Sequence, residues 1–187
     1  MDKRIERTQW DVRRAAIALL GERGYAAFNM EAVARQAGVS KSTLYRHWPT
    51  KLSLIADALE TLNEQPRPVP SQGSVRQRVC RLMQHLAEAL STSQFGACIP
   101  ALMEASHRHA EVAQFLHSYS ARRRRTLVDL LREGVASGEL PAEFDAEMAA
   151  LALSGAIFYQ RSMTPEPFAA DDIPSLVTLV LGPERPN

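Results

Sequence analysis

Seven residues near the N-terminus, Lys41 to His47 (KSTLYRH), combine several hydrogen-bond donors with no carboxylate. Leu44 and Trp48 are four residues apart, so a helix would turn both of them toward the same side. The outer faces would then carry the remaining polar side chains: Lys41, Ser42, Thr43, Tyr45, Arg46 and His47. Cations and hydroxyls without acidic neighbours suit a surface lined with phosphates. The stretch therefore predicts contact with a nucleic acid.

The flanking residues predict two short helices joined by a tight turn. Asn29 and Ser40 are each expected to cap a helix, because their side-chain oxygens accept unpaired backbone N–H groups. Gly38 lies between them, where a left-handed helix end favours glycine. Pro49 closes the second helix, since the residue before a proline disfavours helical geometry. This arrangement predicts a helix-turn-helix, in which the start of the second helix reaches base edges in the major groove.

Within this motif, Lys41, Ser42 and Thr43 are predicted to read bases, while Tyr45 and His47 are better placed for phosphates. Lys51 would open the next helix, adding a cation to a helix end that already attracts phosphate. The complete set of predicted DNA-contact residues is Asn29, Lys41, Ser42, Thr43, Tyr45, Arg46, His47 and Lys51. These residues alone leave one alternative open, a helical hairpin whose polar side chains are merely solvated.

The same region resembles the N-terminal signature of the tetracycline-repressor (TetR) family. The matching residues keep their mutual spacing: Gly24-Tyr25, Ala32-Val33-Ala34, Gly38-Val39-Ser40, Thr43-Leu44-Tyr45 and Pro49-x-Lys51. The resemblance implies a homodimeric transcriptional regulator that binds a pseudo-palindromic operator in double-stranded DNA. It also implies a small-molecule effector that releases the operator. Repression is the habit of the family, and a TetR-type activator remains an alternative.

The composition is that of a soluble globular protein, with 45% apolar and 23% charged residues among 187. Glycine is sparse and β-branched residues form no alternating runs, so we predict an all-α fold of about nine helices. Residues 1–52 hold 10 Lys/Arg against 5 Asp/Glu, whereas residues 53–187 hold 12 against 16. A basic N-terminal part on an acidic remainder is typical of a DNA-binding domain joined to a separate regulatory domain.

Three regions are predicted along the chain. Residues 1–50 form the three-helix DNA-binding domain, whose first helix is expected from Thr8 to Arg23 with Arg13 facing outward. Residues 51–73 form a connecting helix and a linker with three prolines, at positions 66, 68 and 70. Residues 74–187 form a helical domain for ligand binding and dimerisation. Within it, Asp145 is expected to cap the penultimate helix.

The resemblance places an effector cavity in the C-terminal domain. The predicted lining residues are apolar or aromatic side chains of the fifth to eighth helices: Met83, Leu86, Phe95, Ile99, Met103, Phe115, Tyr119 and Phe158. Such a lining with few polar groups suits a small hydrophobic ligand. Each of these residues could equally belong to an ordinary core, and the sequence does not identify the ligand.

The last two expected helices are strongly apolar, so each must bury a face in the core or on a second copy. In the TetR family the last two long helices form a two-fold four-helix bundle. The resemblance therefore implies a dimer interface formed by Ala149, Ala150, Leu153, Ile157, Ile173, Leu176, Val177 and Val180. Packing of these residues inside the chain's own core is the alternative.

Other classes of function find little support in the sequence. It has no Gly-rich phosphate loop, HExxH or nucleophile elbow, so we expect neither an enzyme nor a cofactor. The histidine spacing does not predict a metal site, and Cys80 and Cys98 are expected to be buried free thiols. The charged N-terminus and the short apolar runs predict a cytoplasmic protein without a membrane span. A DNA-bending architectural protein and a protein-interaction bundle remain alternatives, and two-fold, sequence-specific footprinting would separate them from a regulator.

Overall fold

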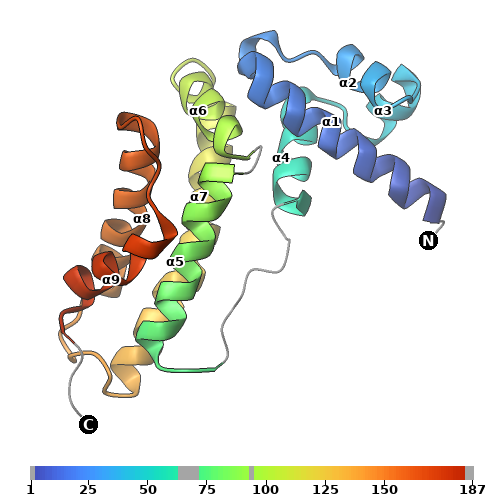
Figure 1. Ribbon diagram of the computed structural model, residues 1–187. Helices are drawn as coiled ribbons and strands as arrows, with labels where there is room; N and C mark the ends of the chain where they lie inside the picture. The colour runs from blue at the N-terminus through green and yellow to red at the C-terminus, as the bar shows by residue number, and fades with distance from the viewer. Residues whose placement is uncertain (1–2, 63–71, 93–94, 184–187) are drawn as a thin grey trace. The chain divides into compact units, whose positions relative to one another are not determined.

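The computed structural model describes residues 3–62, 72–92 and 95–183. In these residues the chain forms nine α-helices and one short 3-10 helix, which confirms the predicted all-α fold (Figure 1). It divides into two compact units. Unit 1 comprises Met1–Pro66 and Gln94–His117, and unit 2 comprises Arg67–Ser93 and Ser118–Asn187.

Unit 1 contains α1 (Lys3–Ala27), α2 (Met30–Gln36), α3 (Lys41–His47), α4 (Lys51–Leu62), α6 (Phe95–Ser106) and the start of α7 (Ala110–Ala136). The first helix begins earlier than predicted, and Gly24, with a φ of 72°, breaks its helical geometry directly after the predicted last residue, Arg23. Its buried face packs against both α4 and α6.

Cys98 of α6 lies at the α1 contact, where it is fully buried with its Sγ 3.4 Å from the carbonyl oxygen of Ile17. Burial raises the pKa of this thiol to about 12, so Cys98 is a neutral core residue at physiological pH. Cys80 on the fifth helix is only half-buried, which differs from the burial predicted for both thiols.

Unit 2 contains α5 (Val75–Thr92), the remainder of α7, α8 (Ala146–Met163), the 3-10 helix η1 (Ala170–Asp172) and α9 (Ile173–Leu181). Its core forms where α5 packs against α8 and α9. Asp145 caps α8 as predicted, because its Oδ1 accepts the Met148 N–H at 3.0 Å. Ser74 and Gln77 form a reciprocal capping box at the start of α5, each side chain accepting the other's backbone N–H.

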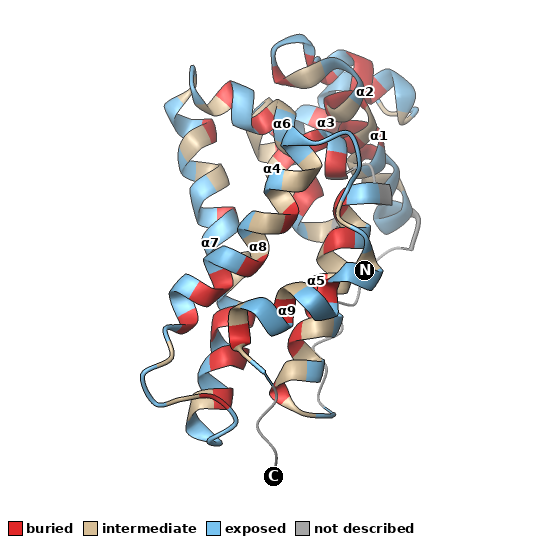
Figure 2. Cartoon of the chain, turned by 60° about the vertical axis from the view of Figure 1, so that its left-hand side comes forward, coloured by how far each residue is buried: buried red, intermediate tan, exposed pale blue. Residues whose placement is uncertain are grey.

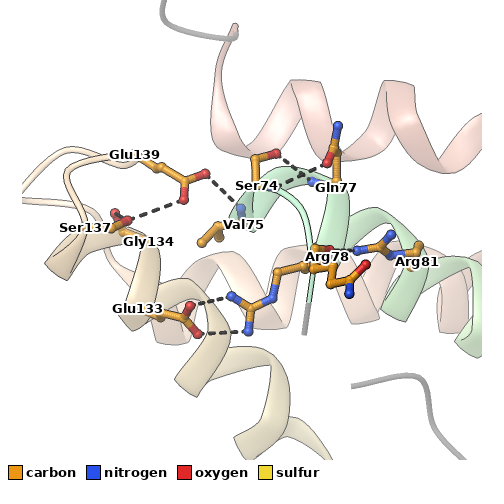
Figure 3. A network of polar contacts seen from close by, with 10 residues as sticks. Ser74, Val75, Gln77, Arg78, Arg81, Glu133, Gly134, Ser137 and Glu139 are labelled. Carbon is orange, nitrogen blue, oxygen red and sulfur yellow. Dashed lines mark hydrogen bonds and ion pairs between the residues drawn. The ribbon is translucent and has the colours of Figure 1, made fainter. Parts of the chain in front are cut away.

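A polar network ties the start of α5 to the end of α7 (Figure 3). The Arg78 guanidinium donates two hydrogen bonds to the Glu133 carboxylate, of which Nη2–Oε2 measures 2.9 Å. The Glu139 carboxylate accepts the Val75 N–H at 2.8 Å. The hydrogen bonds from Arg78 lower the pKa of Glu133, and those same bonds raise the pKa of Arg78. The first turn of α5 is therefore held by charge-assisted bonds as well as by its capping box.

Part of the predicted organisation falls outside the described residues. The structure does not describe residues 63–71, which hold the three linker prolines, or the side chain of Phe95. The domain boundaries at residues 50 and 74 stay predictions. Among the described helices, none has both the length and the apolar character to cross a membrane.

Candidate nucleic-acid interface

The turn between α2 and α3 is built from local hydrogen bonds. Asn29 caps α2 as predicted, its Oδ1 accepting the Glu31 N–H at 2.7 Å. At the other end, the Val39 N–H donates to the Ala34 carbonyl at 2.9 Å, and the Gly38 N–H donates to the Arg35 carbonyl at 3.3 Å. Gly38 has a φ of 67°, so this pair of bonds is a Schellman motif that ends α2 and redirects the chain.

The second helix of the motif begins at a serine cap. The Ser40 Oγ accepts the Thr43 N–H at 3.1 Å, and the hydroxyls of Ser42 and Thr43 lie 2.9 and 2.8 Å from it. Leu44 is fully buried and Trp48 nearly so, as their spacing predicts. Five of the outward side chains are exposed: Lys41, Ser42, Tyr45, Arg46 and His47. The sixth, Thr43, is half-buried. No carboxylate belongs to α3 itself.

A carboxylate from α2 nevertheless reaches this surface. The Lys41 ammonium forms an ion pair with Glu31, and both side chains remain more than half exposed. An exposed pair of this kind contributes at most about 1 kcal/mol, so it can exchange for a nucleic-acid contact. The sequence analysis did not anticipate this pair, because the partners are ten residues apart on two different helices.

Lys51 is docked within unit 1. Its Nζ donates a hydrogen bond to the Tyr25 carbonyl at 3.1 Å and lies 3.9 Å from the centre of the Tyr25 ring. That ring is buried and lies 5.4 Å from the ring of His109. Burial, with a smaller effect from Glu111, raises the pKa of Tyr25, so it stays neutral. Lys51 therefore ties the start of α4 to the end of α1, and its contact with phosphate stays a prediction.

The predicted effector residues are distributed over both units. In unit 1, Ile99 and Phe115 are half-buried and Met103 is exposed. The four in unit 2 are buried or half-buried: Met83, Leu86, Tyr119 and Phe158. A pocket of about 300 Å³ in unit 1 lies instead beside α3, with Val12, Leu44 and Trp48 among its lining residues. It contains none of the predicted effector residues, so their common cavity stays a prediction.

The dimer interface on α8 and α9 stays a prediction, and the burial of its residues in the single chain bears on it. Most of the predicted residues lie in the core of their own chain, six of them nearly or fully buried: Ala149, Ala150, Leu153, Ile157, Ile173 and Val177. Leu176 and Val180 are half-buried. A side chain already covered by its own chain adds no surface to an interface. The opposite faces of α8 and α9 carry exposed apolar side chains, namely Met148, Leu151, Tyr159, Met163 and Leu179. Figure 2 shows that both helices carry buried as well as exposed residues.

These features define a class of protein. Two short helices joined by a Schellman turn, with an exposed acid-free second helix, form a helix-turn-helix for DNA binding. Residues 12–58 match the family described as bacterial regulatory proteins, tetR family, and residues 69–180 match the tetracyclin repressor-like C-terminal domain. The chain therefore belongs to the TetR family of transcriptional regulators, which is not a family of enzymes.

Individual relatives agree with this membership. The HTH-type transcriptional regulator YdeS of Bacillus subtilis (strain 168) is 32% identical over 86% of this chain and 81% of its own length. The crystal structure of the TetR family regulator SCO0332 superposes with a TM-score of 0.75 at 28% identity, covering 96% of this chain and 99% of that one. AibR, in complex with isovaleryl coenzyme A and operator DNA, shares the fold with a TM-score of 0.67 at 18% identity, covering 94% and 99%.

Proposed function

We propose that this protein is a cytoplasmic, homodimeric transcriptional repressor that binds a pseudo-palindromic operator and is released from it by a small hydrophobic ligand. The observation that carries the proposal is the outward face of α3, where Lys41, Ser42, Tyr45, Arg46 and His47 are exposed and no residue of the helix is acidic. Lys41 and Ser42 are at the start of α3, the end that approaches base edges in a helix-turn-helix.

Dimerisation follows from the limited information that one recognition helix can read. Each good bidentate contact discriminates by about 1–3 kcal/mol, against roughly a million or more competing genomic sites. A two-fold axis doubles the contacts and requires two half-sites of opposite orientation. Pairing through the exposed faces of α8 and α9 would bury side chains such as Leu151 and Leu179, the latter 81% exposed in the single chain. Gly155, at the centre of the α8 face, has open space for an approaching helix.

Release by a ligand requires that the ligand bind the DNA-free geometry better than the DNA-bound one. The crystal structure of AibR contains both isovaleryl coenzyme A and operator DNA, which makes acyl thioesters a first class of ligand to test here. The predicted lining residues of unit 2, including Met83, Tyr119 and Phe158, would supply apolar surface for an acyl chain.

The DNA-binding part of the proposal is tested with an operator obtained by selection from random oligonucleotides. Fluorescence anisotropy then compares the selected and shuffled DNA over a range of salt concentrations. We expect a preference of roughly a thousandfold or more and a steep salt dependence. Lys41→Ala should reduce the ratio of the affinities for selected and shuffled DNA. Arg108→Ala, which removes an exposed cation of unit 1 outside the motif, should leave it unchanged. Equal binding of every DNA by the wild type would refute the proposal.

The ligand part is tested by adding isovaleryl coenzyme A, longer acyl thioesters and free coenzyme A to the DNA complex. Release by an acyl thioester but not by free coenzyme A would support a hydrophobic effector. Phe158→Ala, at a half-buried position of the predicted lining, should weaken this release while leaving DNA binding intact. If no thioester changes either DNA affinity or the unfolding temperature, this ligand class is wrong, and the DNA-binding proposal stands independently.

A further inference from the structure

The carboxylate of Asp57 on α4 joins three helices of unit 1. Its Oδ2 accepts a hydrogen bond from Trp48 Nε1 at 2.7 Å and another from Arg13 Nε at 2.8 Å. Its Oδ1 accepts from Thr61 at 3.3 Å and from Arg13 Nη2 at 3.4 Å. The Arg13 guanidinium also lies 5.8 Å from the centre of the Trp48 ring. Asp57 is thus the common acceptor for a residue of α1 and the residue that ends α3.

The recognition helix has few other attachments. Within α3 only Leu44 is buried, and Trp48 is the residue that terminates the helix one turn later. Apolar packing of Leu44 is non-directional and permits small rotations of the helix. A hydrogen bond from the indole N–H fixes the direction of the Trp48 ring, and a charged acceptor makes that bond strong. The side chains of Arg13 and Asp57 are 17% and 33% exposed, so solvent weakens this cluster only in part.

We infer that Asp57 is a positioning residue for sequence reading, because it fixes the orientation of α3 against α1 and α4 through Trp48. This inference rests on the proposed DNA-binding function and adds to it a determinant of specificity outside the recognition helix. Asp57 does not contact bases; it sets where Lys41 and Ser42 present their donors. Loss of the carboxylate leaves every predicted contact residue in place but less well oriented.

If the charge of Asp57 were all that mattered, its removal would strengthen DNA binding, which is the opposite of what a positioning role predicts for the operator. Removing a carboxylate from a DNA-binding unit makes that unit more positive, which strengthens binding to any DNA. Positioning predicts weaker binding to the operator and unchanged or slightly tighter binding to random DNA. Trp48→Phe provides a second, charge-neutral route to the same defect, since it removes the indole donor and keeps an aromatic ring. An ordinary stabilising ion pair predicts a lower unfolding temperature with no loss of preference.

The test compares wild type, Asp57→Ala, Trp48→Phe and the double variant by anisotropy on selected and shuffled DNA, well below the unfolding temperature of each. We expect each single variant to lose roughly tenfold or more of the operator preference, and the double variant to lose no more than either single one. Asp57→Asn, whose amide oxygen still accepts from the indole, should recover part of the preference. Asp11→Ala is the matched control, because it removes an exposed aspartate from the same unit.

An NMR spectrum of the indole N–H groups supplies an independent readout. The chain has two tryptophans, and Asp57→Ala should shift the Trp48 signal while leaving that of Trp10 in place. Retention of the full preference by Asp57→Ala, or additive losses in the double variant, would overturn the inference. A wild type without any preferred sequence would overturn the proposed function itself, and this inference with it.

Discussion

Leu151 and Leu153 lie two residues apart on α8, yet Leu151 is 49% exposed in the single chain and Leu153 is 0% exposed. The same substitution to alanine should therefore act on two different equilibria. Leu153→Ala opens a cavity in the core of unit 2, and such truncations cost about 2–5 kcal/mol of folding stability. In a chain of this length the unfolding temperature should fall by roughly 4 to 20 °C.

In the proposed dimer, Leu151→Ala should act mainly on association. Full burial of a leucine side chain contributes about 1.5–3 kcal/mol, so covering the exposed half gives about 1 kcal/mol per copy. Two-fold symmetry counts that loss twice, and about 2 kcal/mol corresponds to a roughly 30-fold rise in the dimer dissociation constant. Sedimentation velocity over a range of concentrations measures this constant, and thermal unfolding at a fixed concentration measures stability.

The dimer dissociation constant and the unfolding temperature should distinguish the two variants. Leu151→Ala should lower the unfolding temperature only at concentrations where the wild type is dimeric, because association stabilises the folded chain by mass action. Leu153→Ala should lower it at every concentration. If Leu151→Ala left dimerisation unchanged, or if Leu153→Ala weakened dimerisation without destabilising the chain, the assignment of the exposed α8 face to the interface would be refuted.

Three further predictions concern local features. Glu31→Gln should raise the affinity for all DNA severalfold in anisotropy titrations, because it releases Lys41 and removes a carboxylate near the phosphates. Unchanged affinity would show that the ion pair does not compete with DNA. Gly38→Ala should cost about 1 kcal/mol in urea unfolding, since φ is 67° there while no atom lies within 4 Å of the added carbon. Glu133→Gln should lower the unfolding temperature at pH 7, and the difference should vanish in acid. Arg78 lowers the pKa of Glu133, so the ion pair stabilises the fold fully above the ordinary carboxyl pKa. That stabilisation is lost as the pH falls through the lowered pKa. A difference in unfolding temperature that did not depend on pH would exclude this mechanism.

The features that could be predicted from the sequence are those determined within a few residues. Asn29, Ser40 and Asp145 cap their helices as expected, because a cap depends on one side chain and the next turn of backbone. The turn at Gly38 followed from the same kind of local chemistry. Leu44 and Trp48 also point inward as their spacing requires. Local rules were sufficient to place every outward side chain of α3.

Contacts between distant residues were beyond these rules. Arg13 was expected to face solvent, but its side chain is largely buried against Asp57, 44 residues later. One signal was available, since a buried indole N–H usually requires an acceptor and Trp48 was predicted to be buried. On α8, by contrast, apolar residues occur on nearly every side of the helix. Periodicity could identify that helix without distinguishing the core face from the exposed one, which explains why most of the predicted interface residues are buried in the single chain.

The shortness of α3 determines how a signal could act on DNA reading. Its range, Lys41–His47, is well below the length at which an isolated helix is stable in water, so its geometry depends on its attachments. The attachment to α4 is directional, because Asp57 holds Trp48, and Lys51 on the same helix holds the carbonyl of Tyr25 at the end of α1. Since α1 also packs against α6, a displacement of α6 would reach α3 through α1 and these two polar contacts. An effector would then need only to redirect α3 by a small angle, without unfolding any part of the DNA-binding unit.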